Sequence, residues 1–185
     1  NIVFRNNKKN YSLKVPLIGL FQIKNLFMSI LAAKLSGLDT KKTLNIVKDI
    51  KEVNGRLQLI RTIPNQTKVF IDYAHTPDAL RTTLKTLKEH YNIKPIVVFG
   101  CGGQRDKKKR PIMAKVCEKN AKKIYVTDDN PRNENPKLIR QMILSGFSKK
   151  LVITEIPLRA KAIETAIIKS KPSSIVLMAG KGHET

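Results

Sequence analysis

The sequence is poor in several features that would place it in a specialised class of protein. It has no tryptophan, aromatic residues make up only 5%, and cysteine occurs twice. No apolar run approaches the roughly 20 residues of a membrane-spanning helix, and the charged start has no leader-like apolar core. The cysteines form neither a C-x-x-C pair nor a disulfide framework, and no cluster has metal-ligand spacing. We therefore expect a cytoplasmic protein without a membrane partner or a metal site in this chain.

Acidic residues are also scarce. The chain has 14 aspartates and glutamates but 36 lysines and arginines, which gives a net charge of +22. Such an excess raises the hypothesis of a basic nucleic-acid-binding protein. The lysines are dispersed, however, and no helix-turn-helix, zinc or RNP signature accompanies them. We interpret the charge as a solvated surface whose field would also favour an anionic substrate. We predict no specific nucleic-acid partner and keep that hypothesis as an alternative.

The first 54 residues predict a small α+β segment. Residues 1–18 suggest two strands, NIVF and YSLKVPLI, around a polar turn at 6–10. Apolar residues at helical spacing predict a helix over 22–36 that Gly37 ends, and Asp39 or Thr40 caps a second helix. The segment is too short to bury a core of its own. We interpret residues 1–54 as the tail of a larger domain.

Strands and helices alternate after the turn at Asn54-Gly55, which we take as the domain boundary. This alternation predicts a doubly wound, mainly parallel α/β sheet for residues 55–185. The apolar run Ile96–Phe99 is typical of a strand buried on both faces. Strands are expected at 57–62, 69–72, 96–99, 124–127, 151–154 and 175–179, and helices at 77–90, 111–120, 136–147 and 158–170.

Four unusual loops follow predicted strands, and parallel sheets bind ligands at the carboxyl ends of their strands. The loops are IDYAHTPD, FGCGGQRDKKKRP, VTDDNPRNENP and MAGKGHET. Asp72 can accept hydrogen bonds from a sugar, although Asp72 or Thr76 can equally cap the next helix. The glycines around Cys101 let backbone amides approach an anion. They fit neither a Walker A loop nor a dinucleotide fingerprint, and Cys101 reads as a packed thiol.

The last two loops each offer a charged candidate residue, Arg132 in the third and Glu184 in the fourth. The Asx-Pro turn before Arg132 presets its guanidinium, which suits a carboxylate; the alternative is a plain turn with an exposed arginine. Glu184 lies in a glycine-rich turn, where it can pair with an ammonium group or simply follow the strand. Taken alone, His75 and His183 are more typical of hydrogen-bonded structural histidines.

Four such loops in this order resemble the Mur ligase family, the ATP-dependent amino-acid-adding enzymes of peptidoglycan synthesis. Gly19-Leu20-Phe21-Gln22-Ile23-Lys24-Asn25 is similar to the end of the family's central ATP-binding domain, with Gln22 in place of an asparagine. Asp129-Asn130-Pro131-Arg132 resembles the D-N-P-R signature of its diaminopimelate-adding branch. The resemblance implies nucleotide contacts for Asn25, Arg56, Asp72 and His75, and amino-acid contacts for Arg105, Asp129, Asn130, Pro131, Arg132, Gly180 and Glu184.

The resemblance further implies a reaction. ATP, with Mg²⁺, would convert the D-glutamate carboxylate of UDP-N-acetylmuramoyl-L-alanyl-D-glutamate to an acyl phosphate, which the amine of meso-diaminopimelate attacks. Family members carry the phosphate loop, the magnesium ligands and the UDP-binding domain upstream of the part that matches Asn1. We therefore expect a fragment without catalytic residues, inactive alone, from a monomeric enzyme.

The residues themselves favour diaminopimelate. It differs from lysine by one distal carboxylate, and only that group gives a preset Arg132 a partner. A pocket built on polar partners rejects an analogue lacking them by about 10⁴-fold. The lysine-adding member, folylpolyglutamate or cyanophycin synthetases and a non-catalytic remnant remain the alternatives.

Overall fold

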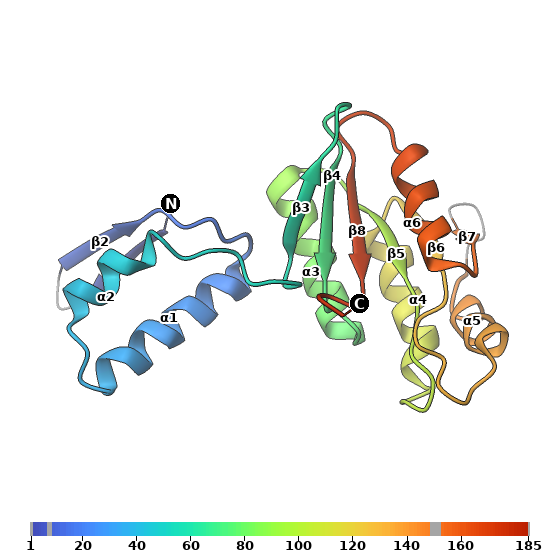
Figure 1. Cartoon of the computed structure of the whole chain (residues 1–185), viewed down its shortest axis with the longest axis horizontal. Helices are drawn as coiled ribbons and strands as arrows, with labels where there is room; N and C mark the ends of the chain where they lie inside the picture. The colour runs from blue at the N-terminus through green and yellow to red at the C-terminus, as the bar shows by residue number, and fades with distance from the viewer. Residues whose placement is uncertain (1, 7–8, 149–152, 185) are drawn as a thin grey trace. The chain divides into compact units, whose positions relative to one another are not determined.

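The computed structural model describes residues 2–6, 9–148 and 153–184. They form two compact units, Asn1–Glu52 and Val53–Thr185 (Figure 1).

The first unit begins with two antiparallel strands, β1 (Ile2–Asn6) and β2 (Lys9–Leu13). The prediction of two strands is confirmed, but their bounds were wrong. Asn6 pairs with Lys9 and Asn10 with Arg5, so both ends of the expected polar turn belong to strands. Within the described residues the strand pairing ends earlier than expected, with Leu13 opposite Ile2. Residues 7 and 8 lie outside the described part of the chain.

Two helices complete this unit, α1 (Leu20–Leu35) and α2 (Thr40–Val47). Gly37 follows α1 with a φ of +86°, a conformation that glycine adopts without strain. Asp39 caps α2, since its Oδ1 accepts the amide of Lys42 at 2.8 Å. Few apolar side chains are buried, and a larger set is exposed: Leu20, Met28, Leu31, Leu35, Leu38 and Ile46.

The second unit is a six-stranded sheet in the order β3-β4-β8-β5-β6-β7, with only β3 antiparallel to its neighbour. The predicted mainly parallel α/β fold is confirmed. The strands are β3 (Gln58–Thr62), β4 (Lys68–Asp72), β5 (Ile96–Phe99), β6 (Lys123–Val126), β7 (Ile153–Glu155) and β8 (Ile175–Ala179). The helices are α3 (Pro77–Tyr91), α4 (Lys109–Asn120), α5 (Pro136–Leu144) and α6 (Arg159–Ile168).

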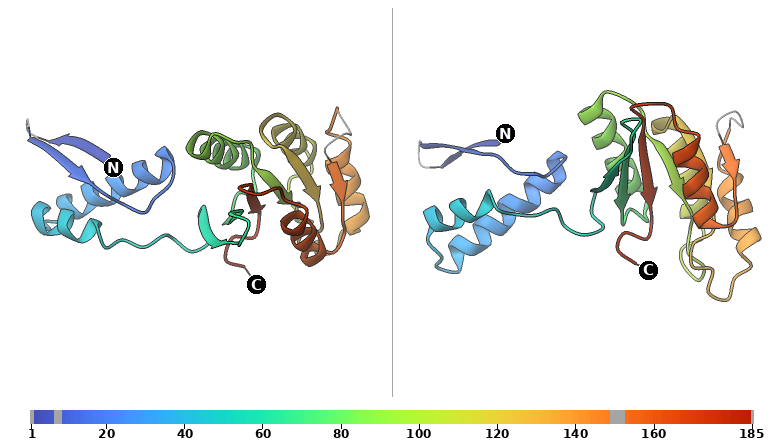
Figure 2. Two further views of the ribbon diagram at one scale, coloured as in Figure 1. Left: turned by 90° about the horizontal axis from the view of Figure 1, so that it is seen from above. Right: turned by 45° about the horizontal axis from the view of Figure 1, so that its top comes forward.

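The strand order explains which helices cover which face. The chain moves in one direction along the sheet from β4 through β5 and β6 to β7, and then returns to β8 between β4 and β5. Because parallel crossovers are right-handed, the helix of the return step lies on the opposite face from those of the forward steps. Figure 2 shows α3 and α4 on one face and α6 on the other.

The core lies on both faces of the central strands. Every residue of β5 is buried, as its apolar run predicts. Against one face pack Leu80, Leu84 and Leu87 of α3, all fully buried. Against the other, Ala162 and Ala166 of α6 contact a cluster that includes Ile96, Val98, Tyr125 and Val176.

The register brings the ends of the parallel strands to one edge. Asp72 at the end of β4 pairs with Ala179 at the end of β8, and Phe99 of β5 pairs with Val126 of β6. The four loops that the sequence singled out therefore leave the sheet side by side.

Candidate functional site

The four loops line a polar pocket of about 130 Å³ at this edge of the sheet. Three lining residues, Tyr73, Gly102 and Lys109, are not among the predicted site residues. The other seven are among them: His75, Arg105, Asp129, Asn130, Arg132, Gly180 and Glu184.

A larger pocket of about 270 Å³ lies at the other edge, near the first residues of β5 and β6. Its charged lining consists of Lys122, Lys123, Lys169 and Lys171. It contains none of the predicted site residues and no acidic group. The smaller pocket, which gathers seven of the predicted site residues, is therefore the candidate site.

Arg132 is held by Asn130 of its own loop and by Gly103 of the loop after β5. Its own φ is +48°, and its amide donates to Oδ1 of Asn130 at 3.1 Å, an Asx turn. Nη1 donates to the carbonyl of Gly103 at 2.7 Å, and the amide of Gly103 donates to the carbonyl of Asn130 at 2.9 Å. The guanidinium thus has a fixed direction while the side chain stays exposed.

Asp129 and Gly180 lie beside each other in the lining of the pocket. Oδ1 of Asp129 accepts the amide of Asn130 at 2.7 Å, and its Oδ2 lies 3.9 Å from Nη1 of Arg159. Burial lowers the pKa of Arg159, and the charge of Asp129 opposes that shift. Gly180 has a φ of +115°, and a Cβ there would lie 3.1 Å from Oδ2 of Asp129. Glycine therefore leaves room beside the carboxylate.

Glu184 is oriented by Tyr73, whose Oη donates to Oε1 of Glu184 at 2.9 Å. This bond and the charge of Glu184 raise the pKa of Tyr73. The guanidinium of Arg56 lies over the ring of Tyr73, 4.4 Å from the centroid of that ring. The rings of Tyr73 and His75 meet edge to face, with their centroids 4.9 Å apart. Tyr73 thus connects the predicted nucleotide residues with the predicted amino-acid residues. The sequence offered one sign of this, an amphipathic aromatic side chain within a polar loop.

Asp72 lies inside the protein, only 6% exposed. Its carboxylate accepts hydrogen bonds from the amides of Leu57 at 2.6 Å and Ala74 at 2.9 Å, and from the hydroxyl of Thr83 at 3.2 Å. Burial raises the pKa of Asp72, and the three hydrogen bonds oppose the rise. A carboxylate has about four acceptor positions, so contact with a nucleotide stays a prediction.

The hydroxyl of Thr76 caps α3 by accepting the amide of Ala79 at 3.3 Å, which decides between the two candidate caps. His75 is exposed, and its Nδ1 lies 3.0 Å from the carbonyl of Tyr73. Because a carbonyl only accepts, Nδ1 is the protonated nitrogen and Nε2 can serve a ligand. Lys109 reinforces the loop by donating from Nζ to the carbonyl of His75 at 2.9 Å.

Four predicted residues are not among those that line the pocket: Arg56 and Asp72, described above, and Asn25 and Pro131. Asn25 belongs to α1 of the first unit, where it is exposed and its carbonyl accepts the hydroxyl of Ser29 at 3.0 Å. Pro131 packs against Gly103, where an added Cβ would come within 1.8 Å of the proline carbonyl. The roles of Asn25 and Pro131 remain predictions.

Cys101 is 3% exposed, and burial raises the pKa of its thiol to about 12. This confirms the interpretation of Cys101 as a packed thiol. Among the described residues, no three His, Cys, Asp or Glu side chains gather as metal ligands would. None of the helices in the described ranges has the length and apolarity to cross a membrane.

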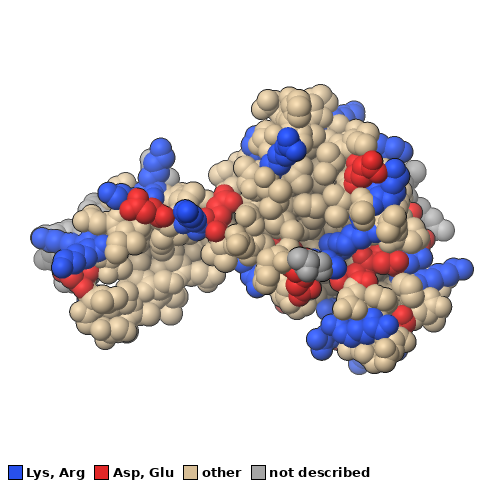
Figure 3. All heavy atoms as spheres, in the orientation of Figure 1, with Lys and Arg blue, Asp and Glu red and all other residues tan. Residues whose placement is uncertain are grey.

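The basic surface has no single focus in the view of Figure 3. Lys and Arg side chains are spread over both units there, with Asp and Glu among them. This arrangement agrees with the interpretation of the charge as a solvated surface.

The fold and the pocket define an α/β domain that can hold a small zwitterion at the carboxyl ends of parallel strands. Comparison with known proteins identifies the class: residues 55–182 match the family described as Mur ligase, glutamate ligase domain. The chain therefore belongs to the Mur ligase family, which confirms the resemblance.

Particular relatives carry more specific names. The UDP-N-acetylmuramoyl-L-alanyl-D-glutamate–2,6-diaminopimelate ligase of Rickettsia montanensis is 46% identical over 187 residues, and that of Haemophilus influenzae is 42% identical over 184. Each match covers 100% of this chain and 38% of the relative, so the chain spans well under half of their length.

Solved structures agree with these relatives. A structure of a UDP-N-acetylmuramoyl-L-alanyl-D-glutamate–2,6-diaminopimelate ligase is 37% identical, with a TM-score of 0.69 over 96% of this chain and 36% of that one. The UDP-N-acetylmuramate-alanine ligase of Thermotoga maritima is 25% identical, with a TM-score of 0.70 over 94% of this chain and 37% of its own.

Proposed function

We propose that the protein carrying this chain is a cytoplasmic, monomeric, ATP-dependent ligase. It adds meso-diaminopimelate to UDP-N-acetylmuramoyl-L-alanyl-D-glutamate during peptidoglycan precursor synthesis. Residues 55–185 supply the amino-acid pocket and part of the nucleotide site, and residues 1–54 are the last part of the ATP-binding domain. The relatives named above for diaminopimelate support this assignment.

The observation that carries the proposal is the meeting of Arg132 with Glu184 and Asp129 in one pocket. The distal end of diaminopimelate bears one carboxylate and one ammonium on the same carbon. Arg132 presents a fixed guanidinium to the carboxylate, and the two acidic side chains attract the ammonium. Asn130 and the carbonyl of Gly180 add neutral partners.

The same arrangement disfavours lysine, whose distal end is an ammonium alone. Lysine can satisfy Glu184 and Asp129 but leaves Arg132 without its anionic partner. Selectivity of about 10⁴-fold is within reach of a site that rejects an analogue by leaving a polar group unpaired.

The nucleotide contacts are proposed for Arg56, Asp72 and His75 in the second unit and for Asn25 in the first. The contact of Arg56 with Tyr73 supports a location for the phosphates beside the pocket. Magnesium would balance the phosphate charge. The described residues gather no carboxylate cluster for it.

In the proposed reaction, an oxygen of the D-glutamate carboxylate attacks the γ-phosphorus of ATP, and ADP leaves. The proximal amine of diaminopimelate then attacks the acyl carbon of the acyl phosphate. The tetrahedral intermediate expels phosphate, and the amine nitrogen loses a proton as the amide forms. By holding the distal end, Arg132 and Glu184 position the attacking amine, an advantage of orientation.

Turnover of meso-diaminopimelate and L-lysine by the whole protein tests this proposal. We expect kcat/KM to be about 10⁴-fold higher for meso-diaminopimelate. A preference for lysine would refute the assignment and point to the lysine-adding alternative. Residues 1–185 alone should show no ATP hydrolysis and no amide formation, and turnover by this fragment would contradict the division of labour proposed here.

A further inference from the structure

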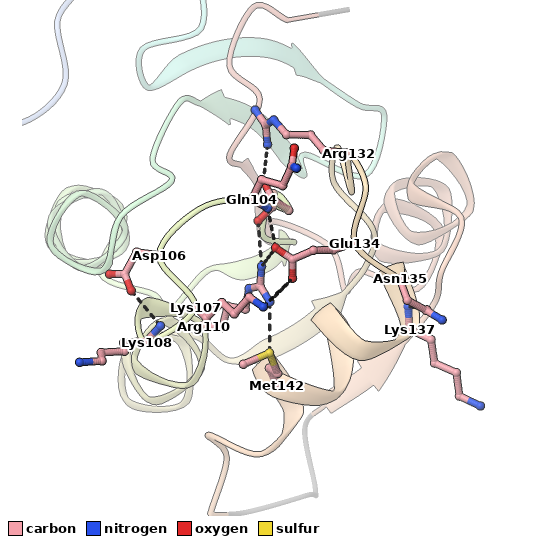
Figure 4. Close-up of polar contacts among 12 residues, drawn as sticks. Gln104, Asp106, Lys107, Lys108, Arg110, Arg132, Glu134, Asn135, Lys137 and Met142 are labelled. Carbon is pink, nitrogen blue, oxygen red and sulfur yellow. Dashed lines mark hydrogen bonds and ion pairs between the residues drawn. The ribbon is translucent and has the colours of Figure 1, made fainter.

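An ion pair between Arg110 and Glu134 lies close to Gln104 and Arg132, two residues of the loops that form the proposed amino-acid pocket (Figure 4). Arg110, near the start of α4, has a side chain with 0% exposure. Its Nη1 donates to Oε2 of Glu134 at 2.9 Å, and its Nη2 donates to Oε1 at 3.0 Å. This two-pronged geometry fixes both planes relative to each other.

The pair joins two of the loops that form the pocket. Nη2 of Arg110 also donates to the carbonyl of Gly102 at 3.3 Å, and the carboxylate of Glu134 accepts the amide of Gln104. Arg132 is anchored on Gly103, between these two contacts. The loop after β5 is thus held at Gly102 by Arg110 of α4, and at Gly103 and Gln104 by Arg132 and Glu134 of the loop after β6.

Stability alone is a poor explanation for this pair. Among the residues that the structure describes, Nε of Arg110 is buried without a hydrogen-bond partner, and Nη1 has only the sulfur of Met142, at 3.1 Å, besides Glu134. A buried ion pair is often no better than well-packed apolar residues of similar volume, whereas its directional bonds can select one conformation. Hydrogen bonds from Arg110 and from the amide of Gln104 lower the pKa of Glu134 to about 2, so the pair stays ionised at neutral pH.

We propose that Arg110 and Glu134 are positioning residues that fix the guanidinium of Arg132 for the distal carboxylate of the amino-acid substrate. This inference rests on the proposed function and deepens it. Neither residue lines the pocket, so both act through the loops and through Arg132. Their loss lets the two loops separate and the guanidinium leave its direction, while Glu184, held by Tyr73, keeps its place.

The test uses the whole protein with Glu134→Gln and with the double variant Arg110→Met/Glu134→Leu. Glu134→Gln keeps the shape but removes the charge. The double variant replaces the pair with apolar side chains beside Met142, which is expected to restore folding stability. The matched control is Glu155→Gln, which weakens another arginine pair, Arg140 Nε to Glu155 Oε1 at 2.6 Å, outside the pocket.

The readouts are KM and kcat for meso-diaminopimelate and for L-lysine, the Kd for meso-diaminopimelate by calorimetry, and the melting temperature. Misplacement of a positioned group by about 1 Å can cost about 10²-fold. We expect kcat/KM for meso-diaminopimelate to fall about 10²-fold in both variants, mainly through KM, with lysine kinetics unchanged. The double variant should regain the wild-type melting temperature without regaining the wild-type KM.

Other outcomes overturn the inference. If the double variant recovers both stability and the wild-type KM, the pair is structural only. If Glu155→Gln raises KM as much as Glu134→Gln, the effect is not specific to this pair. A wild-type preference for lysine is a different failure, since it removes the proposed function itself.

Discussion

Replacing Arg132 with methionine should remove the preference for meso-diaminopimelate while leaving lysine largely unaffected. A guanidinium has five N–H donors, and the structure commits one to the carbonyl of Gly103. Two others can grip the distal carboxylate. Charge-assisted hydrogen bonds contribute about 1.5–3 kcal/mol each, so their loss costs about 3–6 kcal/mol, or about 10²–10⁴-fold in kcat/KM.

The assay is steady-state amide formation with each amino acid, comparing wild type, Arg132→Met and a control, Arg81→Met. Arg81→Met makes the same chemical change on the exposed surface of α3. Arg81 pairs there with Asp78, and their side chains are 44% and 89% exposed, respectively. Exposed pairs contribute about 0–1 kcal/mol, so this control should keep wild-type kinetics. Equal losses for both amino acids in Arg132→Met would refute the reasoning, because they would show that Arg132 does not read the extra carboxylate.

Three further predictions concern the supporting structure. Gly103→Ala places a Cβ 1.8 Å from the carbonyl of Pro131, and we expect a loss of about 1–3 kcal/mol by denaturant unfolding; unchanged stability would contradict the close approach. The stability contributed by ionised Glu134 is fully present above pH 4.5 and is lost as the pH falls toward about 2. The difference in unfolding free energy between wild type and Glu134→Gln should therefore narrow over that pH range. A constant difference would contradict the pairing. Cys101 and Cys117, both buried, should resist iodoacetamide in the native protein at neutral pH and react after unfolding, as mass spectrometry can measure.

Most of the fold could be predicted because its signals are local. The strand predicted at Ile96–Phe99 has the same bounds in the structure, and Asp39, one of the two predicted caps, caps α2. Errors occurred where tertiary contacts decide. The helix expected at 111–120 begins at Lys109, one residue before Arg110, whose buried side chain pairs with the distant Glu134.

The candidate site could be predicted as a set of loops but not as a set of contacts. Strand ends meet at one edge of a parallel sheet, so the sequence placed Arg132 and Glu184 together. It could not show that Tyr73 bonds to Glu184 or that Arg110 pairs with Glu134, because these partners are far apart in the chain. From spacing alone, the charged side chains of the loop before α4 would have been predicted to lie in solvent.

Main-chain contacts hold the pocket together, and this explains why glycines are concentrated there. A Cβ on Gly100 would lie 2.4 Å from the carbonyl of Thr127, and one on Gly103 would lie closer still to that of Pro131. The loops after β5 and β6 therefore touch backbone to backbone, with little apolar packing to fix their relative position. Hydrogen bonds and the Arg110–Glu134 pair must therefore fix the relative position of these two loops, as close packing does for side chains in a core. Substitutions on the basic surface should then leave selectivity intact, whereas changes at these buried polar contacts should alter it before they unfold the domain.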